Sequence, residues 1–302
     1  NKLSDVAQRI AAMSNHMVNE ASPIADTRLE DGSRVSIVLP PVAINGPIIT
    51  IRKFFNKPIT IDRLIELESI TPEAAQFLEK LVKSKYNIFI SGGTGSGKTT
   101  FLNVLSDYVP DDERVITIED SAELQLHNIN NIVRLEARVA NSEGTNAVSI
   151  RDLIKASLRM RPDRIVVGEV RGPEAIDMLQ AMNTGHDGSL STGHANSPKD
   201  MLTRLETMVL MGMDMPVSAI RAQISSAIDI IVHLARLRDK SRKVVQIAEV
   251  GNCINGEIAL TPLFKFVENS QDKNGKVIGT LVRQNNVFNR TEKLEAAGFS
   301  EW

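Results

Sequence analysis

One ten-residue stretch constrains this chain more than any other. The segment SGGTGSGKTT, residues 91–100, contains four glycines, one lysine and five small hydroxyl residues, so it has almost nothing to bury. It follows the apolar run YNIFI and precedes a segment with the pattern of a helix. Residues 92–99 match G-x-x-x-x-G-K-[ST] at every fixed position, in the strand–loop–helix context that the pattern requires. The stretch therefore predicts a phosphate-binding loop at the end of a buried strand.

Each residue type in this phosphate loop (residues 92–99) has a physical reason to be there. Glycines allow the backbone to wrap closely around an anion and to aim N–H groups at it, and the N-terminus of the next helix adds a favourable dipole. Lys98 is expected to supply positive charge to the β- and γ-phosphates of ATP or ADP, and Thr99 to supply a hydroxyl for Mg²⁺. Thr100 is counted with the loop, although we expect it to be structural. The predicted nucleotide-binding residues here are Gly92, Gly93, Thr94, Gly95, Ser96, Gly97, Lys98, Thr99 and Thr100.

Strand and helix patterns alternate from residue 86 onward. Strands are predicted at 87–91, 114–119, 131–136, 164–168 and 189–193. Helices are predicted at 98–107, 149–160, 173–184 and 197–211. This alternation is typical of an α/β fold in which helices cover a mostly parallel sheet.

The rest of the chain divides around this region. Residues 1–57 predict a small α+β domain, with a helix at 3–19, two strands flanking the Asp31-Gly32 turn and a further strand in PIITIRKF. Residues 58–72 read as a linker, residues 73–268 as the main domain and the polar residues 269–302 as a weakly ordered tail. The first residues read as a helix already under way, so we expect an upstream part that is missing here.

Composition excludes several classes of protein. The 302 residues carry 35 Lys and Arg against 37 Asp and Glu, a net charge of −2, so no global field draws the chain to DNA or an acidic membrane. Aromatic residues make up 4% of the chain, which disfavours a nucleic-acid channel built from stacking side chains. The single cysteine, Cys253, excludes a disulfide framework and a four-cysteine zinc site. No apolar run approaches the ~18–20 residues that span a bilayer.

Acidic residues follow two of the predicted strands, at the edge of a parallel sheet where ligands bind. Glu169 follows the apolar strand RIVV and is a candidate to hold Mg²⁺ through water. Glu119 and Asp120 end the strand RVITIE, where Glu119 could polarise an attacking water and Asp120 could fix Glu119 or join the metal shell. The alternatives are an exposed acid at a strand end for Glu169 and an ordinary pair of loop acids for the other two. Asp163 precedes its strand and is expected to cap or turn the chain.

Basic residues complete the set that hydrolysis would need, because positive charge must stabilise the transition state. His194 follows a third strand and could donate a hydrogen bond to a γ-phosphate, or could be a satisfied structural histidine. Arginines cluster around the Glu169 strand and predict either a polar interface or an anion shell: Arg159, Arg161, Arg164 and Arg171. Arg34 and Arg52 stand in apolar strands of the first domain and need a partner, either an internal carboxylate or a neighbour's phosphate.

Taken together, four ordered stretches resemble the type II/type IV secretion ATPase superfamily. They are GGTGSGKTT for the Walker A loop, VITIEDSAELQL for the Asp box, LRMRPDRIVVGEVRG for Walker B and STGHANS for the His box. DGSRVSIVLPP, ITIRKF and LQAMNTGHDGSLSTGHANSPKDMLTRLETMVLM are similar to the CpaF/TadA branch, the tight-adherence (Flp) pilus assembly ATPases. The likeness covers roughly residues 1–267, and the missing tetracysteine zinc element favours this branch over the type II branch.

The resemblance implies a RecA-like P-loop ATPase domain preceded by a small PAS-like α+β domain. It implies that Lys98 and Thr99 bind phosphate and Mg²⁺, that Glu169 supports Mg²⁺ and that Glu119 is the general base. His194 would sense the γ-phosphate. Further nucleotide contacts would come from arginines: Arg159 across a subunit boundary, Arg34 and Arg52 from the N-terminal domain, and Arg171.

The family implies a homohexamer that acts on inner-membrane pilus platform proteins from the cytoplasmic face of the membrane. It would drive pilus assembly and could also drive retraction, with no zinc and no specific nucleic acid. Three alternatives stay open: a type IV secretion ATPase that exports effectors or DNA, a RecA-like nucleic-acid motor, and a scaffold that binds nucleotide without turning it over.

Overall fold

The computed structural model describes residues 2–14, 16–53, 58–138 and 146–299. Its internal contacts divide the chain into two compact units, Asn1–Pro58 and Ile59–Trp302. Each unit contains a sheet of its own, and the two sheets share no strand. The division falls one residue beyond the end that the sequence predicts for the N-terminal domain.

The N-terminal unit is a three-stranded antiparallel sheet with one helix packed against it. The helix is α1 (Lys2–Met13), and the strands are β1 (Ile24–Arg28), β2 (Arg34–Val38) and β3 (Ile48–Arg52), paired in that order. Alternate residues of β2, Val35 and Ile37, are buried against Ala7 and Ala11 of the helix. This pattern of buried and exposed residues along a strand is what one covered sheet face requires. The predicted small α+β domain is confirmed.

The larger unit alternates strands and helices as the sequence predicts, and most predicted limits agree to within two residues. Its helices are α2 (Ile61–Glu66), α3 (Pro72–Lys83), α4 (Lys98–Ser106), α5 (Ile150–Ser157), α6 (Glu174–Asn183), α7 (Pro198–Gly212), α8 (Val217–Ala227) and α9 (Glu292–Ala296). Its strands are β4 (Ile88–Gly92), β5 (Arg114–Glu119), β6 (Asn131–Glu136), β7 (Arg164–Val167), β8 (Leu190–Gly193), β9 (Ile230–Arg236), β10 (Arg242–Ile254), β11 (Glu257–Gln271) and β12 (Val277–Arg283).

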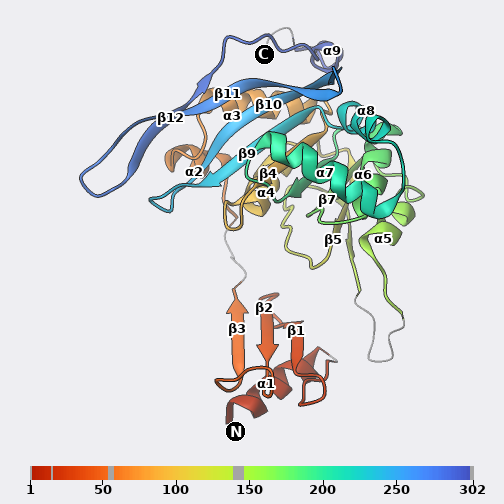
Figure 1. The fold of residues 1–302 in the computed structure, drawn as a ribbon, viewed down its shortest axis with the longest axis vertical. Helices are drawn as coiled ribbons and strands as arrows, with labels where there is room; N and C mark the ends of the chain where they lie inside the picture. Colours follow the sequence, from red (N-terminus) through yellow and green to blue (C-terminus); the bar gives the residue numbers. More distant parts are fainter. Residues whose placement is uncertain (1, 15, 54–57, 139–145, 300–302) are drawn as a thin grey trace. The chain divides into compact units, whose positions relative to one another are not determined.

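These strands form one nine-stranded sheet in the order β12-β11-β10-β9-β4-β8-β7-β5-β6. The six strands from β9 to β6 pair in parallel, whereas β9 to β12 pair antiparallel. Figure 1 shows the long β11–β12 hairpin reaching away from the helices of this unit. The prediction of an α/β fold with a mostly parallel sheet is confirmed.

Helices cover both faces of this sheet. One core contains side chains of α3 and α4 together with Ile88 and Ile90, and the other contains side chains of α5 to α8 together with Phe89. Consecutive residues of β4 therefore face opposite layers, so the strand is apolar along its whole length. A loop that follows such a strand starts from a rigid support. No helix in the described ranges is long and apolar enough to cross a bilayer.

Residues 269–302 differ from the weakly ordered tail that the sequence predicts. They include the end of β11, all of β12 and the short helix α9. Val277 and Leu281 of β12 are buried, and Phe288 packs in the core beside Phe77. The predicted linker over 58–72 likewise contains helix α2, whose N-cap is Thr60. Polar composition misled the prediction here because tertiary partners, rather than local periodicity, order these segments.

Candidate active site

The phosphate loop joins β4 to α4, as the sequence predicts. Three of its four glycines, Gly92, Gly95 and Gly97, have backbone conformations or close contacts that a larger residue would not accept. Gly97 is the N-cap of α4 and has φ of 96°, in the left-handed region. A Cβ atom on Gly92 would collide with the carbonyl oxygen of Leu234, so β9 lies directly against the loop.

Lys98 is buried and curls back into the phosphate loop. Its Nζ donates to the carbonyl oxygens of Gly92 and Gly93, both at 3.1 Å, and lies 3.2 Å from Nδ1 of His194. Burial lowers the pKa of Lys98, an effect that Glu169 opposes. The ammonium group of Lys98 thus has neutral carbonyl oxygens as hydrogen-bond partners. The charged oxygens of a phosphate could replace them and would bind the ammonium more strongly.

Glu119, Glu169 and His194 meet at one edge of the sheet because they end three neighbouring parallel strands, β5, β7 and β8. Nε2 of His194 lies 2.7 Å from Oε1 of Glu169, and Arg171 donates to Oε2 of Glu169 at 2.6 Å. Burial lowers the pKa of His194, and the positive charge of Lys98 lowers it further. A neutral imidazole can accept from Lys98 at Nδ1 while its Nε2 faces the carboxylate. His194 therefore connects the loop lysine to the strand-end acid.

Glu119 is 4% exposed and lies beneath Gly168. Its Oε1 accepts hydrogen bonds from the backbone N–H groups of Glu123 and Leu124, at 2.8 and 2.9 Å. Its Oε2 is buried and has no hydrogen-bond partner among the residues that the structure describes. Burial raises the pKa of this carboxyl group, against the opposing effect of the two backbone donors. One oxygen is thus anchored and the other is left for a proton or a water.

A magnesium ion would find donors of the right chemistry here. Mg²⁺ in phosphate sites is usually held by one or two protein oxygens together with waters and phosphate oxygens. Thr99 offers a hydroxyl, and Glu169 offers a partly buried carboxylate whose Oε1 and Oε2 now contact His194 and Arg171. Asp120 is more exposed and lies 3.8 Å from Arg171. Within the described ranges, no group of three or more His, Cys, Asp or Glu residues could hold a metal ion.

The other predicted arginines are not part of this cluster. Arg159 and Arg161 follow α5 and precede β7, at the opposite end of that strand from Glu169. Arg164 is fully buried and pairs with Glu113, so it is structural. The four arginines that the sequence groups together thus divide, and only Arg171 contacts the strand-end acids.

Arg34 and Arg52 lie in the N-terminal unit, on neighbouring strands. Arg34 begins β2 and Arg52 ends β3, and the two face each other in the register of that sheet. Like charges at directly opposed positions are unfavourable, so an anion that contacts both would stabilise the pair. Their assignment to the nucleotide stays a prediction.

Sequence reasoning missed two contacts of the phosphate loop. Ser91 Oγ lies 2.7 Å from Nδ1 of His233 on β9, and burial lowers the pKa of that histidine. Arg242, at the start of β10, donates from Nε to the carbonyl oxygen of Gly95 at 2.8 Å. These partners are 142 and 147 positions apart, so no local pattern in the sequence could have revealed them.

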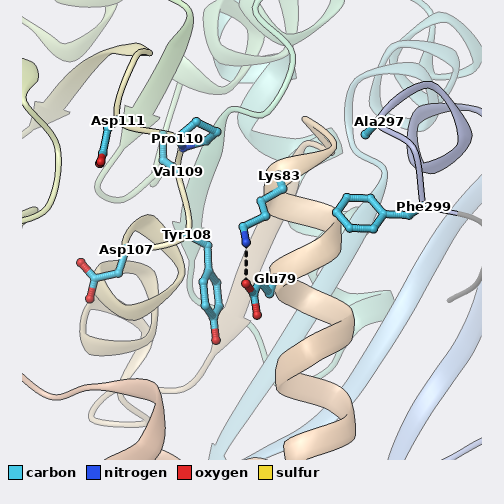
Figure 2. A pocket seen from close by; sticks show the side chains of 9 residues that line it. All are labelled: Glu79, Lys83, Asp107, Tyr108, Val109, Pro110, Asp111, Ala297 and Phe299. Atoms are coloured by element: carbon cyan, nitrogen blue, oxygen red, sulfur yellow. Dashed lines mark hydrogen bonds and ion pairs between the residues drawn. The ribbon is translucent and has the colours of Figure 1, made fainter.

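A separate hollow of about 530 Å³ lies at the far end of α4 from Lys98 (Figure 2). It is lined by Glu79 and Lys83 of α3, by the turn that follows α4, and by Phe299. The ion pair between Lys83 and Glu79 occupies its wall, and burial raises the pKa of Tyr108 to about 12. Glu119, Glu169 and His194 lie elsewhere, at the edge of the sheet where the phosphate loop is.

Comparison with known proteins finds one matching family profile and several similar proteins. A family profile described as "Type II/IV secretion system protein" matches residues 1–287. A Mycobacterium tuberculosis protein, provisionally named a conjugal transfer protein, is 39% identical over 80% of this chain and 70% of its own length. The type IV secretion system protein PtlH of Bordetella pertussis is 37% identical over 74% of each chain. The solved VirB11 ATPase of the Brucella suis type IV secretion system, in complex with sulphate, is 29% identical and covers 82% of each chain with a TM-score of 0.54.

Proposed function

Because this chain belongs to the type II/IV secretion system protein family and is an ATPase, we propose that it is a ring-forming motor that powers a secretion or pilus machine. ATP hydrolysis at the phosphate loop would be turned into movement of a membrane-bound assembly. The observation that carries this proposal is the meeting of Lys98, Glu169 and His194 at the carboxyl ends of parallel strands. An adjoining strand end supplies Glu119.

The nucleotide would bind with its β- and γ-phosphates over residues 92–99. Thr99 and Glu169 would hold Mg²⁺, with Asp120 in its outer shell, and the ion would neutralise charge on the phosphates. Lys98 would exchange its two carbonyl partners for phosphate oxygens. His194 would then lose the lysine as a neighbour and report the change to Glu169, which it touches.

Glu119 is suited to be the general base that orients the attacking water. Its unpartnered Oε2 is buried, and burial raises the pKa of the carboxyl group toward the range in which it can take up a proton. The anchored Oε1 keeps the group in one orientation. Glu169, by contrast, has both His194 and Arg171 as neighbours and is better placed to support the metal.

Arg159 supports a site that two chains share. Strand β7 separates Arg159 from Glu169 by four strand residues, roughly 13 Å along the strand. The side chain therefore starts at the wrong edge of the sheet to serve its own phosphate loop. In a closed ring of identical chains, head-to-tail contacts could bring such a surface to the next subunit's site. We assign Arg159 to that role and take a homohexamer as the assembly, with Arg34 and Arg52 contributing further contacts to the nucleotide.

For the machine itself we favour a tight-adherence (Flp) pilus system, in which the ring drives a platform protein at the cytoplasmic face of the inner membrane. The sequence stretches that resemble that branch, from residues 31–41 to 179–211, support it. The alternative is export of effectors or DNA by type IV secretion, which the names of PtlH and VirB11 favour. In cells that carry Lys98→Ala, loss of surface pili with normal export would support the first. The reverse result would support the second.

A mixing experiment tests the shared site directly. Lys98→Ala removes a chain's own phosphate site but keeps its Arg159, whereas Arg159→Ala does the opposite. We expect each variant alone to lose turnover, by about 10³-fold or more for Arg159→Ala, which should keep its affinity for ADP. Mixed in equal amounts and reassembled, they should regain about a quarter of the parent activity, because about one interface in four then pairs an intact site with an intact arginine.

Two controls are needed to interpret the activity of the mixture. Mixing each variant with itself sets the baseline, and Arg63→Ala, which alters an exposed pair with Glu66, serves as the matched arginine control. No gain on mixing would show that Arg159 does not act across a subunit boundary. Turnover by Lys98→Ala at the parent rate would show that the phosphate loop is not the site of hydrolysis.

A further inference from the structure

Arg242 lies over the tip of the phosphate loop, although it is 147 residues away from Gly95 in the sequence. Its Nε donates to the carbonyl oxygen of Gly95 at 2.8 Å. Its Cδ lies 3.3 Å from the point where a Cβ of Gly97 would be. One side chain therefore touches the loop at two glycines, both of which have positive φ.

We propose that Arg242 is a positioning residue of the nucleotide site, which holds one peptide group of the phosphate loop in the orientation that binds phosphate. The proposal rests on the proposed function, because it assumes that a nucleotide binds at residues 92–99. Nothing in the reaction requires Arg242 to touch the reacting atoms. It acts through the carbonyl oxygen of Gly95.

The planarity of the peptide bond couples the carbonyl group that Arg242 contacts to the next N–H group of the loop. In a trans peptide the C=O of one residue and the N–H of the next point in opposite directions. When Arg242 holds the C=O of Gly95 outward, the N–H of Ser96 must point inward. That N–H donates to the carbonyl oxygen of Gly93 at 3.3 Å, a long hydrogen bond that a phosphate oxygen could replace. Gly95 has φ of 71° and no side chain, so little else prevents this peptide group from turning over.

The backbone of Arg242 is itself fixed, so the guanidinium is held from a rigid base. Ser69 Oγ donates to the carbonyl oxygen of Arg242 at 2.8 Å, and the N–H of Val244 donates to the carbonyl oxygen of Ser69 at 2.8 Å. The buried ammonium of Lys243 donates to the carbonyl oxygen of Glu68 at 2.7 Å. The start of β10 is therefore tied to the turn between α2 and α3.

Substitutions can separate the hydrogen bond from the charge. In glutamine the amide nitrogen occupies the same place along the side chain as Nε of arginine, so Arg242→Gln keeps a donor near Gly95 and removes the charge. Arg242→Ala removes both. Arg238→Ala is the matched control, because Arg238 lies in the same β9–β10 hairpin and pairs with Glu268 rather than with the loop.

The experiment is a titration of each variant with fluorescent ADP, followed by steady-state ATP hydrolysis. We expect Arg242→Ala to weaken ADP binding about five- to tenfold, the factor to which one ordinary hydrogen bond corresponds. Its kcat at saturating ATP should stay within about twofold of the parent, since only the positioning of the loop for binding is affected. Arg242→Gln should recover most of the affinity, and Arg238→Ala should match the parent. The thermal midpoint of each variant checks that it is folded.

Three outcomes would overturn the inference: parent-like affinity in Arg242→Ala, equal weakening in Arg242→Gln and Arg242→Ala, or equal weakening in Arg238→Ala. The second would assign the effect to charge and the third to the hairpin as a whole. Lys98→Ala separates these results from failure of the proposed function. If Lys98→Ala binds ADP as the parent does, the nucleotide does not occupy the phosphate loop, and the premise fails rather than the role of Arg242.

Discussion

The two edges of the parallel part of the large sheet bury similar charged groups but treat them differently. At the carboxyl edge, where β4, β5, β7 and β8 end, Lys98 is held by carbonyl groups, and one oxygen of Glu119 has no hydrogen-bond partner in the described part of the chain. At the amino edge, where these strands begin, Arg164 is fully buried and donates to Glu113 and to the carbonyl oxygens of Val82 and Gly188. The same chemistry thus serves binding at one edge and structure at the other.

Asp229 makes the contrast clearer. This buried carboxylate, just before β9, accepts hydrogen bonds from Arg290 at 2.6 Å, from Lys293 at 3.0 Å and from the backbone N–H of Asn87 at 2.9 Å. A buried charge with several good partners contributes little net stability, but removing a partner is costly. A buried charge with incomplete partners, such as Glu119, costs stability in the empty protein and gains its partner from a ligand. The comparison therefore predicts that substitutions at the two edges have opposite effects.

Lys98→Ala should have the largest effect, and it should lower the rate of ATP hydrolysis without lowering thermal stability. Without the ammonium, charge on the β- and γ-phosphates is not neutralised, so ATP hydrolysis should fall by about 10³-fold or more. The midpoint of thermal unfolding should not fall, because burial already disfavours the charged lysine in the folded state. Phosphate release and calorimetry on the same sample measure both. A large loss of thermal stability would break the comparison, since it would make Lys98 a structural residue as well.

Arg164→Met should lower the stability of the protein and leave ADP binding unchanged. It leaves Glu113 buried with Lys85, at 3.5 Å, as its one charged partner within the described ranges, so the free energy of unfolding should fall by about 3–5 kcal/mol. The ADP affinity of the protein that remains folded should equal that of the parent, because Arg164 is at the other edge of the sheet. Urea unfolding and ADP titration below the unfolding transition measure the two quantities.

A second substitution sharpens this test. Replacing Glu113 by Leu in the Arg164→Met protein removes the unpaired carboxylate and should restore much of the lost stability. Arg63→Ala, which breaks an ion pair whose side chains are 57% and 64% exposed, should change stability by no more than about 0.5 kcal/mol. If the double variant is as unstable as Arg164→Met, the loss comes from packing of the guanidinium rather than from the unpaired acid.

The sequence could predict the carboxyl edge because local rules fix it. Most glycines of the phosphate loop have positive φ, and Glu169 and His194 follow strands whose parallel pairing brings their ends together. The amino edge could not be predicted in the same way. Arg164 looks like one more arginine of a cluster until its partner Glu113, 51 residues away, is seen.

The C-terminal segment also depends on partners that are far away in the sequence. Its polar composition predicts a tail, yet Arg290 and Lys293 are ordered by Asp229, which precedes them by more than 60 residues. Arg242 escaped prediction for the same reason, since its contact with Gly95 depends on β9 placing the start of β10 beside the loop. Sequence patterns predict backbone geometry and strand ends well, whereas charge partners far apart in the chain require the fold.

Among the stability changes expected at the two edges, that of Glu119→Gln should be the smallest, and its sign distinguishes the edges. Burial raises the folded-state pKa of Glu119 above the ordinary value of 4.5, so the unfolded chain ionises first and the parent loses stability as pH rises through that window. Glutamine does not titrate, so the variant should gain thermal stability over the parent as pH rises above 4.5, by about 2–4 °C if the gain is about 1 kcal/mol. Below that pH the difference should shrink. Calorimetry of the nucleotide-free proteins across this range measures it, with Asp112→Asn at an exposed site as the control. A variant that is less stable than the parent at pH 8 would show that Glu119 is matched by its surroundings, as the acids of the amino edge are, and that the two edges do not differ in kind.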